Sequence, residues 1–340
     1  MSVTYLDFEQ PLAALDARVA ALRASETRGP AVTRELRQLA QARRRLEEEV
    51  YRSLSAWERV QLARHVDRPQ ALDYIGRLCR EFFELHGDRS FGDDPAIIAG
   101  IGRCHGHSLA IVGQQRGHTT AERVQRNFGM ANPEGYRKAV RVFRLAERLR
   151  IPILTLVDTQ GAYPGVGAEE RGQAEAIAHT MQTMTTLTVP IVSVVIGEGG
   201  SGGALALAVA DRVLMLEYAC YSVISPEGCA AILYRDRAPE SIARAAEALR
   251  LTARDLLAAG VVDALVPEPA GGAHRNPRRA GEAVERAVVH ALGELRTIAS
   301  ATLVRRRYDR YRRLGAHVDA SAAPRRTRRS TRIAKPRAVR

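Results

Sequence analysis

The sequence lacks the long apolar run that a membrane-spanning helix requires. Its longest apolar stretches, residues 151–157 and 189–196, fall well short of the roughly 18 to 20 residues needed to cross a bilayer. Residues 1–10 also lack the basic cluster and following apolar run that are typical of a secretory signal. We therefore predict that the chain has no transmembrane segment and stays in the cytoplasm.

Cysteine is scarce and widely scattered. No two cysteines form the C-x-x-C pair that commonly organises a tetrahedral zinc site. The 4 cysteines are Cys79, Cys104, Cys220 and Cys229. We predict that all of them are reduced, structural thiols and that this chain binds no metal.

The composition is that of an ordinary globular protein, with 340 residues of which 46% are hydrophobic and 26% charged. A net charge of +13 would suggest nucleic acid or another acidic partner. However, residues 325–340 contain eight basic residues and no acidic one, which leaves about +5 for the rest of the chain. We predict a basic, disordered tail over residues 298–340. Contact with nucleic acid is the less favoured use of this tail, because residues 320–340 hold no aromatic side chain that could stack on bases.

Apolar residues recur at three- and four-residue steps over residues 6–22 and 33–64, a spacing that predicts two amphipathic helices. Residues 25–30 break the pattern between them. The sequence therefore predicts an N-terminal helical arm over residues 1–66. Two uses of this arm stay open, as a docking element or as a cap packed on its own domain.

Residues 94–267 differ, because short apolar runs alternate there with helical stretches, as in α/β proteins. The predicted strands are residues 96–104, 108–114, 152–158, 190–196, 212–217, 220–224 and 261–266. The predicted helices are residues 134–149, 169–187, 204–210, 226–234, 242–249, 253–259 and 276–296. A strand, a glycine-rich loop and a helix follow one another twice, first around residues 161–167 and then around 197–203.

The glycine-rich segment 197–203 (GEGGSGG) follows a predicted strand and precedes a predicted helix. Glycines there expose backbone amides, and the helix N-terminus adds partial positive charge, so the segment suits a phosphate or a developing oxyanion. The alternative to an anion site is a purely structural role, in which the glycines only allow tight helix packing.

Two other functions can be read into the same region. Gly197, Gly199 and Gly202 fit G-x-G-x-x-G, with Glu217 about twenty residues beyond, as in a nicotinamide-dependent dehydrogenase. Against that reading, the following helix is short, and a dinucleotide-binding fold does not require the second glycine loop. The phosphate-binding loop of nucleotide hydrolases is excluded, because no Lys-Ser or Lys-Thr follows the glycines.

A hydrolase is the weakest of these readings. A hydrolase could use a catalytic set made of Ser225, Cys229 and His274. Their spacing, however, matches neither the G-x-S-x-G elbow nor a known triad order. We interpret His274 and Asn276 as residues that order a loop.

Several long motifs, in order along the chain, resemble the alpha subunit of bacterial acetyl-CoA carboxylase carboxyltransferase. The resemblance spans roughly residues 4–297. The motifs are residues 5–11 (YLDFEQP), 126–130 (RNFGM), 133–139 (PEGYRKA), 161–172 (GAYPGVGAEERG), 197–206 (GEGGSGGALA), 221–229 (YSVISPEGC) and 267–277 (PEPAGGAHRNP).

The resemblance implies a crotonase-like α/β fold over residues 67–297, a spiral of β-β-α units whose backbone amides form oxyanion holes. It also implies the reaction: with a beta subunit, the carboxyl group of carboxybiotin on the biotin carboxyl carrier protein moves to acetyl-CoA. The product is malonyl-CoA, in the first committed step of fatty acid biosynthesis. Negative charge would collect on the ureido oxygen of biotin, where a fixed amide donor is worth about 3 to 4 kcal/mol.

By motif match, Gly202 and Gly203 are the predicted biotin-side oxyanion hole. The family assigns the enolate of acetyl-CoA to the beta subunit instead. The predicted cofactor-binding residues around the hole are Gly199, Gly200, Gly161, Ala162, Tyr163 and Gly165. Asp158, Gln160 and Tyr163 are expected to face the ligand at the end of a strand.

Some positions depart from the family pattern or stay ambiguous. The family usually has proline where this chain has Gln160, which leaves open a catalytically retired paralogue that acts as a binding or regulatory module. Four cations could contact CoA phosphates or an acidic carrier domain, or could be solvated surface charges. They are Arg116, Arg126, Arg137 and Lys138.

The resemblance also implies partners. The zinc ribbon and the CoA-side site of the enzyme belong to the beta subunit in this family, so we expect the chain to be inactive alone. An α2β2 carboxyltransferase that works with biotin carboxylase and the biotin carboxyl carrier protein is the predicted assembly. Propionyl-CoA stays open as an alternative acyl-CoA substrate that would accept the carboxyl group.

Overall fold

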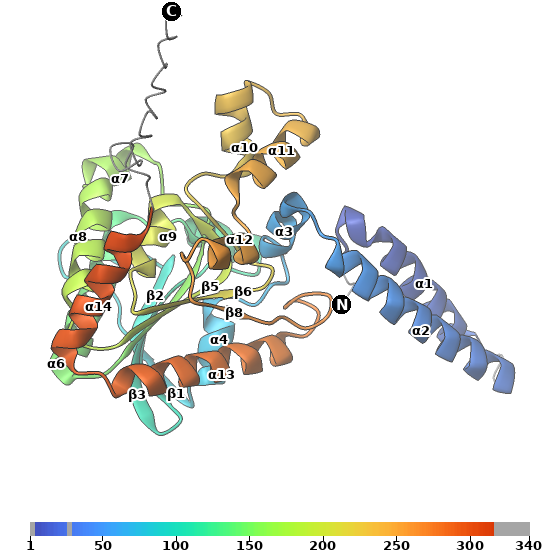
Figure 1. The fold of residues 1–340 in the computed structure, drawn as a ribbon, viewed down its shortest axis with the longest axis horizontal. Coiled ribbons are helices and arrows are strands. Elements are labelled where there is room, and N and C mark those ends of the chain that lie inside the picture. Colours follow the sequence, from blue (N-terminus) through green and yellow to red (C-terminus); the bar gives the residue numbers. More distant parts are fainter. Residues whose placement is uncertain (1–3, 26–28, 316–340) are drawn as a thin grey trace, which may run out of the picture.

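An eight-stranded sheet organises the chain, of which the computed structural model describes residues 4–25 and 29–315 (Figure 1). The strand order is β1-β2-β3-β4-β5-β6-β8, and β7 pairs with the far end of β5. β1, β2 and β3 are antiparallel neighbours, and the later pairs are parallel. The strands are β1 (Glu81–Glu84), β2 (Ile97–Cys104), β3 (His107–Gln114), β4 (Ile153–Thr159), β5 (Ile191–Gly200), β6 (Arg212–Leu216), β7 (Cys220–Ser222) and β8 (Ala264–Val266).

Helices cover this sheet because their apolar residues fall on one face. In α6, Tyr136, Phe143 and Ala146 recur at helical spacing, are fully buried, and face the core beside β2 and β3. The helices in the body of the fold are α3 (Ala56–Ala63), α4 (Ala71–Leu78), α5 (Thr120–Gln125), α6 (Pro133–Leu149), α7 (Val166–Glu170), α8 (Gln173–Thr186), α9 (Ser201–Ala208), α10 (Pro226–Cys229), α11 (Pro239–Leu249), α12 (Ala253–Ala258), α13 (Pro277–Arg296) and α14 (Ser300–Arg313). Short 3-10 turns lie at Asp7–Glu9 and Asn127–Gly129, and a π-helical turn lies at Ala230–Tyr234.

The α/β class and most of the predicted elements are confirmed, with two corrections around the glycines. The predicted loop 197–203 is wrong, because β5 continues through Gly200 and α9 begins at Ser201. The predicted helix 169–187 is divided into α7 and α8 at Gly172, whose φ of 79° lies in the left-handed region that glycine enters readily.

The N-terminal helices α1 (Gln10–Ala24) and α2 (Pro30–Arg52) form a hairpin that projects from the body of the fold (Figure 1). The predicted helix 33–64 is broken before Ser55, which caps α3 by accepting a hydrogen bond from the N–H of Glu58. Buried Glu9 ties the base of the hairpin to the body, because its carboxylate accepts hydrogen bonds from Tyr51 and from Arg275 at 2.8 Å. The division into arm, domain and tail stays a prediction.

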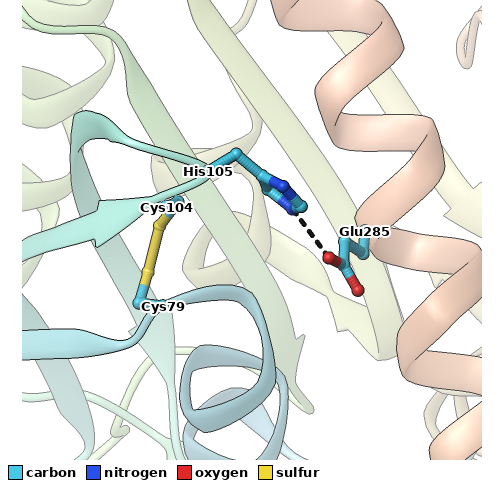
Figure 2. Close-up of a disulfide and its surroundings, with 4 residues drawn as sticks. All are labelled: Cys79, Cys104, His105 and Glu285. Atoms are coloured by element: carbon cyan, nitrogen blue, oxygen red, sulfur yellow. Dashed lines mark ion pairs between the residues drawn. A yellow bond between two sulfur atoms is a disulfide. The ribbon is translucent and has the colours of Figure 1, made fainter.

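Two of the cysteines form a disulfide, so the prediction of four reduced thiols is wrong for Cys79 and Cys104 (Figure 2). Cys79 follows α4 and Cys104 ends β2, and their Cα atoms lie 4.4 Å apart although the residues are 25 positions apart in sequence. The next residue, His105, pairs with Glu285 of α13 at 2.7 Å, so three elements meet at the β2–β3 hairpin. Cys220 and Cys229 are buried and free.

The predicted disordered tail is wrong over Ser300–Arg313, which forms α14; residues 316–340 of that predicted tail lie outside the described residues. Arg307 holds α14 in place. Its fully buried guanidinium donates to both carboxylate oxygens of Asp211, at 2.9 and 2.8 Å, and to three backbone carbonyls. These are the carbonyls of Met184, Leu187 and Val189, at 2.7, 2.8 and 3.1 Å. The sequence pattern missed this helix because seven of its fourteen residues are charged and few are apolar.

Within residues 4–25 and 29–315, none of the helices is by itself long and apolar enough to cross a membrane. Only α13 and α14 taken together, across a bend of 117°, pass that test of length and composition.

Replacing Arg307 by leucine would leave Asp211 and the three carbonyl oxygens buried without their donor. We expect a loss of about 3 to 5 kcal/mol in the free energy of unfolding, because removing one partner of a buried ion pair leaves an uncompensated charge. Urea denaturation followed by circular dichroism measures the change. Arg305→Leu on the same helix, with a side chain 85% exposed, is the matched control. Equal stabilities of the two variants would contradict this role of Arg307.

The loop before β2 should make stability depend on pH. Burial alone would raise the pKa of Asp88, but hydrogen bonds from Arg137 and from the N–H groups of residues 90–92 outweigh burial and lower this pKa to about 2. A lowered carboxyl pKa stabilises the fold above the unfolded value of 3.8, and this contribution disappears as pH falls toward about 2. Asp88→Asn should therefore flatten the dependence of unfolding free energy on pH between about 4 and 2. The measurement is urea unfolding at several pH values. An unfolding free energy that depends on pH equally in the variant and the unmodified chain would contradict this role of Asp88.

Candidate functional site

The segments that follow β4 and β5 meet without intervening side chains. The two strands are parallel neighbours, with Thr159 opposite Gly199, so their carboxyl ends lie at one edge of the sheet. A Cβ atom on Gly203 would lie 2.5 Å from the carbonyl carbon of Gly161 and 2.6 Å from the nitrogen of Ala162. A Cβ atom on Gly200 would lie 2.2 Å from the carbonyl oxygen of Gln160. The structure therefore brings together the two glycine segments that the sequence singles out.

The first turn of α9 leaves backbone donors unused. Gly202 and Gly203 are its second and third residues, and the N–H groups of a helix's first turn have no acceptor within the helix. Among the described residues, neither N–H donates to a backbone carbonyl of a loop or turn. Gly202 is less tightly packed, because a Cβ atom there would meet only the Ile177 side chain, at an ordinary van der Waals distance of 3.7 Å. The helix start adds partial positive charge to these donors.

Ser201, the residue between the strand and these donors, has a φ of 52° and is exposed. A non-glycine residue in the left-handed region costs of order 1 kcal/mol or more, and such residues cluster at binding and catalytic sites. The turn from β5 into α9 therefore keeps an unfavourable local conformation at the point where the two free N–H groups emerge.

Two buried polar side chains that the sequence analysis missed hold the glycine segments in place. Gln114, at the end of β3, donates to the carbonyl of Gly203 at 2.8 Å and accepts from the N–H of Asp158 at 3.0 Å. The hydroxyl of Thr159 donates to the carbonyl of Gly161 at 2.7 Å and accepts from its N–H at 3.1 Å. Both side chains are 0% exposed, so no motif of surface residues could have revealed them.

The second glycine segment offers fewer donors than the first. Thr159 uses the N–H of Gly161, and the N–H of Tyr163 donates to the carbonyl of Ala131 at 3.0 Å. Among the described residues the N–H of Ala162 has no acceptor, and it lies beside Gly203. Gly165 packs against the Tyr163 ring, since a Cβ atom there would lie 2.4 Å from that ring. Ala162 is therefore the residue of this segment whose backbone is best placed to assist Gly202 and Gly203.

Asp158, expected to face the ligand from its place at a strand end, is almost fully buried, and its role toward a ligand stays a prediction. It is 3% exposed and accepts a hydrogen bond from the N–H of Glu198 at 3.0 Å. Burial raises its pKa, and the nearby Arg116 guanidinium, at 3.4 Å, opposes that rise. Position 197 beside Asp158 requires glycine, because a Cβ atom on Gly197 would lie 2.5 Å from a carboxylate oxygen of Asp158.

Ion pairs extend from this carboxylate to the end of α3 and to the lobe formed by α10, α11 and the π-helical turn between them. Arg64, just after α3, pairs with Glu198 at 2.7 Å and with Glu227 of α10 at 2.6 Å. Arg116 also lies 3.5 Å from Glu198. A cavity of about 60 Å³ lies among these groups, lined by Arg64, Arg116 and Asp158 among others. The network fixes the sheet edge relative to the elements on either side of it.

The proposed phosphate-contacting cations are engaged elsewhere. Lys138 is 0% exposed and pairs with Asp93 at 2.6 Å, so its interpretation as a CoA-phosphate contact is wrong. Arg137 pairs with Asp88 at 2.7 Å, and Arg126 donates to the carbonyl of Pro95 at 2.6 Å. With Arg116 in the network above, each of the four is held by an acceptor within the chain.

The residues that a dehydrogenase or a hydrolase would use are not placed as those functions require. Gly197 and Gly199 lie inside β5 instead of a loop, and Glu217 pairs with Arg254 at 3.3 Å. Ser225 caps α10 by accepting from the N–H of Gly228, whereas His274 stacks on His65 with ring centroids 3.8 Å apart. Asn276 caps α13, which agrees with its predicted ordering role.

One cluster, Glu9, His65 and His274, places three potential metal-ligating atoms within 4.8 Å of one another. Glu9 is already bonded to Tyr51 and Arg275, and His65 contacts the Thr4 carbonyl and accepts from the Asp67 N–H. The guanidinium of Arg275 also opposes a cation at this position. We assign the cluster a structural role, and the absence of a metal from this chain stays a prediction.

Comparisons of the whole sequence agree on one family. Residues 5–315 match the family model described as acetyl co-enzyme A carboxylase carboxyltransferase-like. The chain is 53% identical over 319 residues to the acetyl-coenzyme A carboxylase carboxyl transferase subunit alpha of Xanthomonas axonopodis pv. citri, which covers 93% of this chain and 99% of that protein. It is 53% identical over 315 residues to the protein of the same name from Thermus thermophilus, covering 92% and 99%.

Solved structures confirm the crotonase-like α/β fold. Transcarboxylase 12S superposes with a TM-score of 0.56 at 22% identity, over 69% of this chain and 42% of that one. The beta subunit of geranyl-CoA carboxylase from P. aeruginosa superposes with a TM-score of 0.52 at 19% identity, over 72% and 46%. This chain thus spans less than half of either structure, and the likeness is one of fold.

The close contact of the two glycine segments can be tested with alanine at adjacent positions. Gly203→Ala would drive a Cβ atom into the backbone of residues 161–162, and we expect a loss of about 1 to 3 kcal/mol in unfolding free energy. Gly202→Ala adds only an ordinary van der Waals contact with Ile177 and should be neutral or stabilising by up to about 1 kcal/mol, because alanine favours the helix. Chemical denaturation of both variants measures the difference. Equal effects at the two positions would contradict the contact.

Proposed function

The chain belongs to the acetyl-CoA carboxylase carboxyltransferase alpha-subunit family, and on that premise we propose that it forms the biotin-side half of a carboxyltransferase. With a beta subunit, it would transfer the carboxyl group of carboxybiotin to acetyl-CoA and yield malonyl-CoA for fatty acid biosynthesis. The observation that carries this proposal is the pair of unused N–H donors at Gly202 and Gly203, at the start of α9.

These donors suit the charge that the reaction creates. Carboxybiotin bound here on its carrier protein would supply the carboxyl group, and negative charge would develop on its ureido oxygen. The Gly202 and Gly203 N–H groups would donate to that oxygen, with Gly199 and Gly200 shaping the approach. Because the donors are fixed before the reaction, each can lower the barrier by about 3 to 4 kcal/mol.

Buried neighbours of the donors would keep them fixed. Gln114 holds the carbonyl of Gly203, and Thr159 holds Gly161 on the facing segment. The bare contact between Gly203 and Gly161 then sets the position of the Ala162 N–H, the third donor that we place at this site. In this proposal no side chain acts as nucleophile, because decarboxylated biotin can itself accept the proton from acetyl-CoA.

Partner chains complete the proposal. A zinc-ribbon beta subunit would hold the acyl-CoA, and biotin carboxylase and the biotin carboxyl carrier protein would supply carboxybiotin to an α2β2 enzyme in the cytoplasm. The α10–α11 lobe supports a protein partner, since it exposes apolar side chains that a lone chain would leave in water. Val223, Ile232 and Leu233 there are 77%, 67% and 68% exposed.

The competing functions find less support. No comparison points to a nicotinamide enzyme, and the would-be dinucleotide loop is part of a strand. The retired-paralogue alternative rested on Gln160 together with the arginine-rich tail. Gln160 exposes its side chain and places only its backbone against Gly200, and residues 316–340 of the tail lie outside the described residues. Turnover with acetyl-CoA and propionyl-CoA, each measured on the reconstituted α and β subunits, would settle the acyl group; absence of turnover with both would favour the retired form.

Proline at position 202 tests the donor directly. Gly202→Pro removes the N–H, and a helix tolerates proline in its first turn because that N–H has no intrahelical acceptor. We expect kcat to fall by about 100- to 1,000-fold, the usual effect of deleting one oxyanion donor. The measurement is malonyl-CoA-dependent carboxylation of a biotin derivative by the chain reconstituted with its beta subunit.

Gly202→Ala is the matched control for the proline variant, because it changes the same residue and keeps the N–H. Its kcat should stay close to that of the unmodified chain. Thermal unfolding of both variants confirms that the fold survives. Equal kcat values for two folded variants would rule out the Gly202 N–H as a donor.

A further inference from the structure

A basic cleft lies at the edge of the sheet opposite the glycine segments. Arg212 begins β6 and Asp263 immediately precedes β8, so the cleft sits at the amino ends of parallel strands. Gly161 and Gly202, in contrast, follow the carboxyl ends of β4 and β5. The cleft encloses about 520 Å³ between α14, the end of α12 and the turn after α13. Carboxyl transfer as described above makes no use of it.

Arginine dominates the charge of this cleft. Two aspartates, Asp211 and Asp263, also line it, and each is neutralised by one arginine of α14. Those pairs involve Arg307 and Arg310, and Arg212 pairs with Glu294 of α13 at 3.4 Å, so two lining arginines remain without a carboxylate partner among the described residues. The five lining arginines are Arg212, Arg306, Arg307, Arg310 and Arg313.

Three arginines of α14 share the helix face that lines the cleft. Arg306, Arg310 and Arg313 follow one another at four and three residues along α14, which puts them on a single helix face. Arg307, one residue away from Arg306, is instead turned into the core. The sequence pattern by itself reads as a uniform basic run, and only the burial of Arg307 shows which face looks into the cleft.

Several donors on this face have no acceptor. Within the described ranges Arg306 has no ion-pair partner, and Arg313 donates only to the backbone carbonyl of Asp309, at 3.0 Å. The Nε of Arg310 is buried and lacks an acceptor in the same part of the chain. Buried polar atoms are nearly always hydrogen-bonded, so an orphaned guanidinium N–H beside a cavity indicates that a ligand supplies the acceptor.

We propose that this cleft binds a small phosphate-bearing polyanion, such as a pyrophosphate group, free or carried by a nucleotide. Guanidinium groups bind phosphate oxygens through paired hydrogen bonds, and two excess charges match a ligand that carries at least two negative charges. The volume falls within the 300 to 1,000 Å³ that is usual for small-molecule sites. Apolar residues, including Ile298 and Leu314, line the rest of the cleft and could contact a nucleoside.

The test is isothermal titration of the full-length chain at fixed ionic strength with two probes, inorganic pyrophosphate and adenosine 3′,5′-bisphosphate. The test variant is the double substitution Arg306→Gln and Arg313→Gln, which removes two lining charges that take no part in the core. The matched control is Arg305→Gln with Arg312→Gln, which removes the same charge from exposed residues of the same helix outside the cleft lining.

We expect saturable binding of at least one probe by the unmodified chain. The Arg306/Arg313 variant should raise Kd by about tenfold or more, because charge-assisted hydrogen bonds to phosphate are lost. The control pair should leave Kd nearly unchanged. Tighter binding of the nucleotide would identify a nucleotide ligand, and tighter binding of pyrophosphate a free polyphosphate.

Three results would overturn the proposal: no saturable binding of either probe, equal weakening by both double substitutions, or binding that both variants retain. Equal weakening would mean that the helix attracts anions only through its net charge. Because the readout is binding and not turnover, a negative result here leaves the carboxyltransferase assignment untouched, and a failure of that assignment leaves this site untouched.

Discussion

The candidate site depends on the bare contact of two backbone segments. Residues 160–162 after β4 and residues 200–203, from the end of β5 into α9, approach so closely that a Cβ atom on Gly200 or Gly203 would overlap the facing chain. This contact is possible because β4 and β5 are parallel neighbours whose carboxyl ends coincide. At this contact β5 is followed directly by α9. The abrupt strand-to-helix turn leaves the N–H groups of the first helical turn free to bind an anion.

Buried polar groups then hold the contact in one arrangement. Gln114 and Thr159 satisfy backbone groups on both sides of it, and a low-polarity interior makes any alternative that leaves these groups unpaired costly. Farther out, Arg64 joins Glu198 of β5 to Glu227 of α10, so the end of α3 and the lobe share one set of ion pairs with the sheet edge. A site made of backbone amides needs such support, because it has no side chains of its own to adjust.

The C-terminal helix shows how burial separates residues of one type. Arg307 is inside the protein and ties α14 to the loops around Asp211, while Arg306, its neighbour in sequence, borders the basic cleft. The first contributes to stability, because five hydrogen bonds satisfy its guanidinium. The second contributes charge to a surface. Net charge alone, which the sequence reports, cannot distinguish these two roles.

The sequence by itself determined the α/β order of elements, the two glycine segments and the family, because apolar periodicity, glycine positions and motifs are local properties of the chain. The tertiary structure alone decided the Cys79–Cys104 bridge, the burial of Lys138 and Asp158, and the support of Gly203 by Gln114. It also decided that α14 is a helix, although its composition is that of a charged tail. Each of these depends on partners that are distant in sequence, and local patterns carry no record of which distant residues will meet.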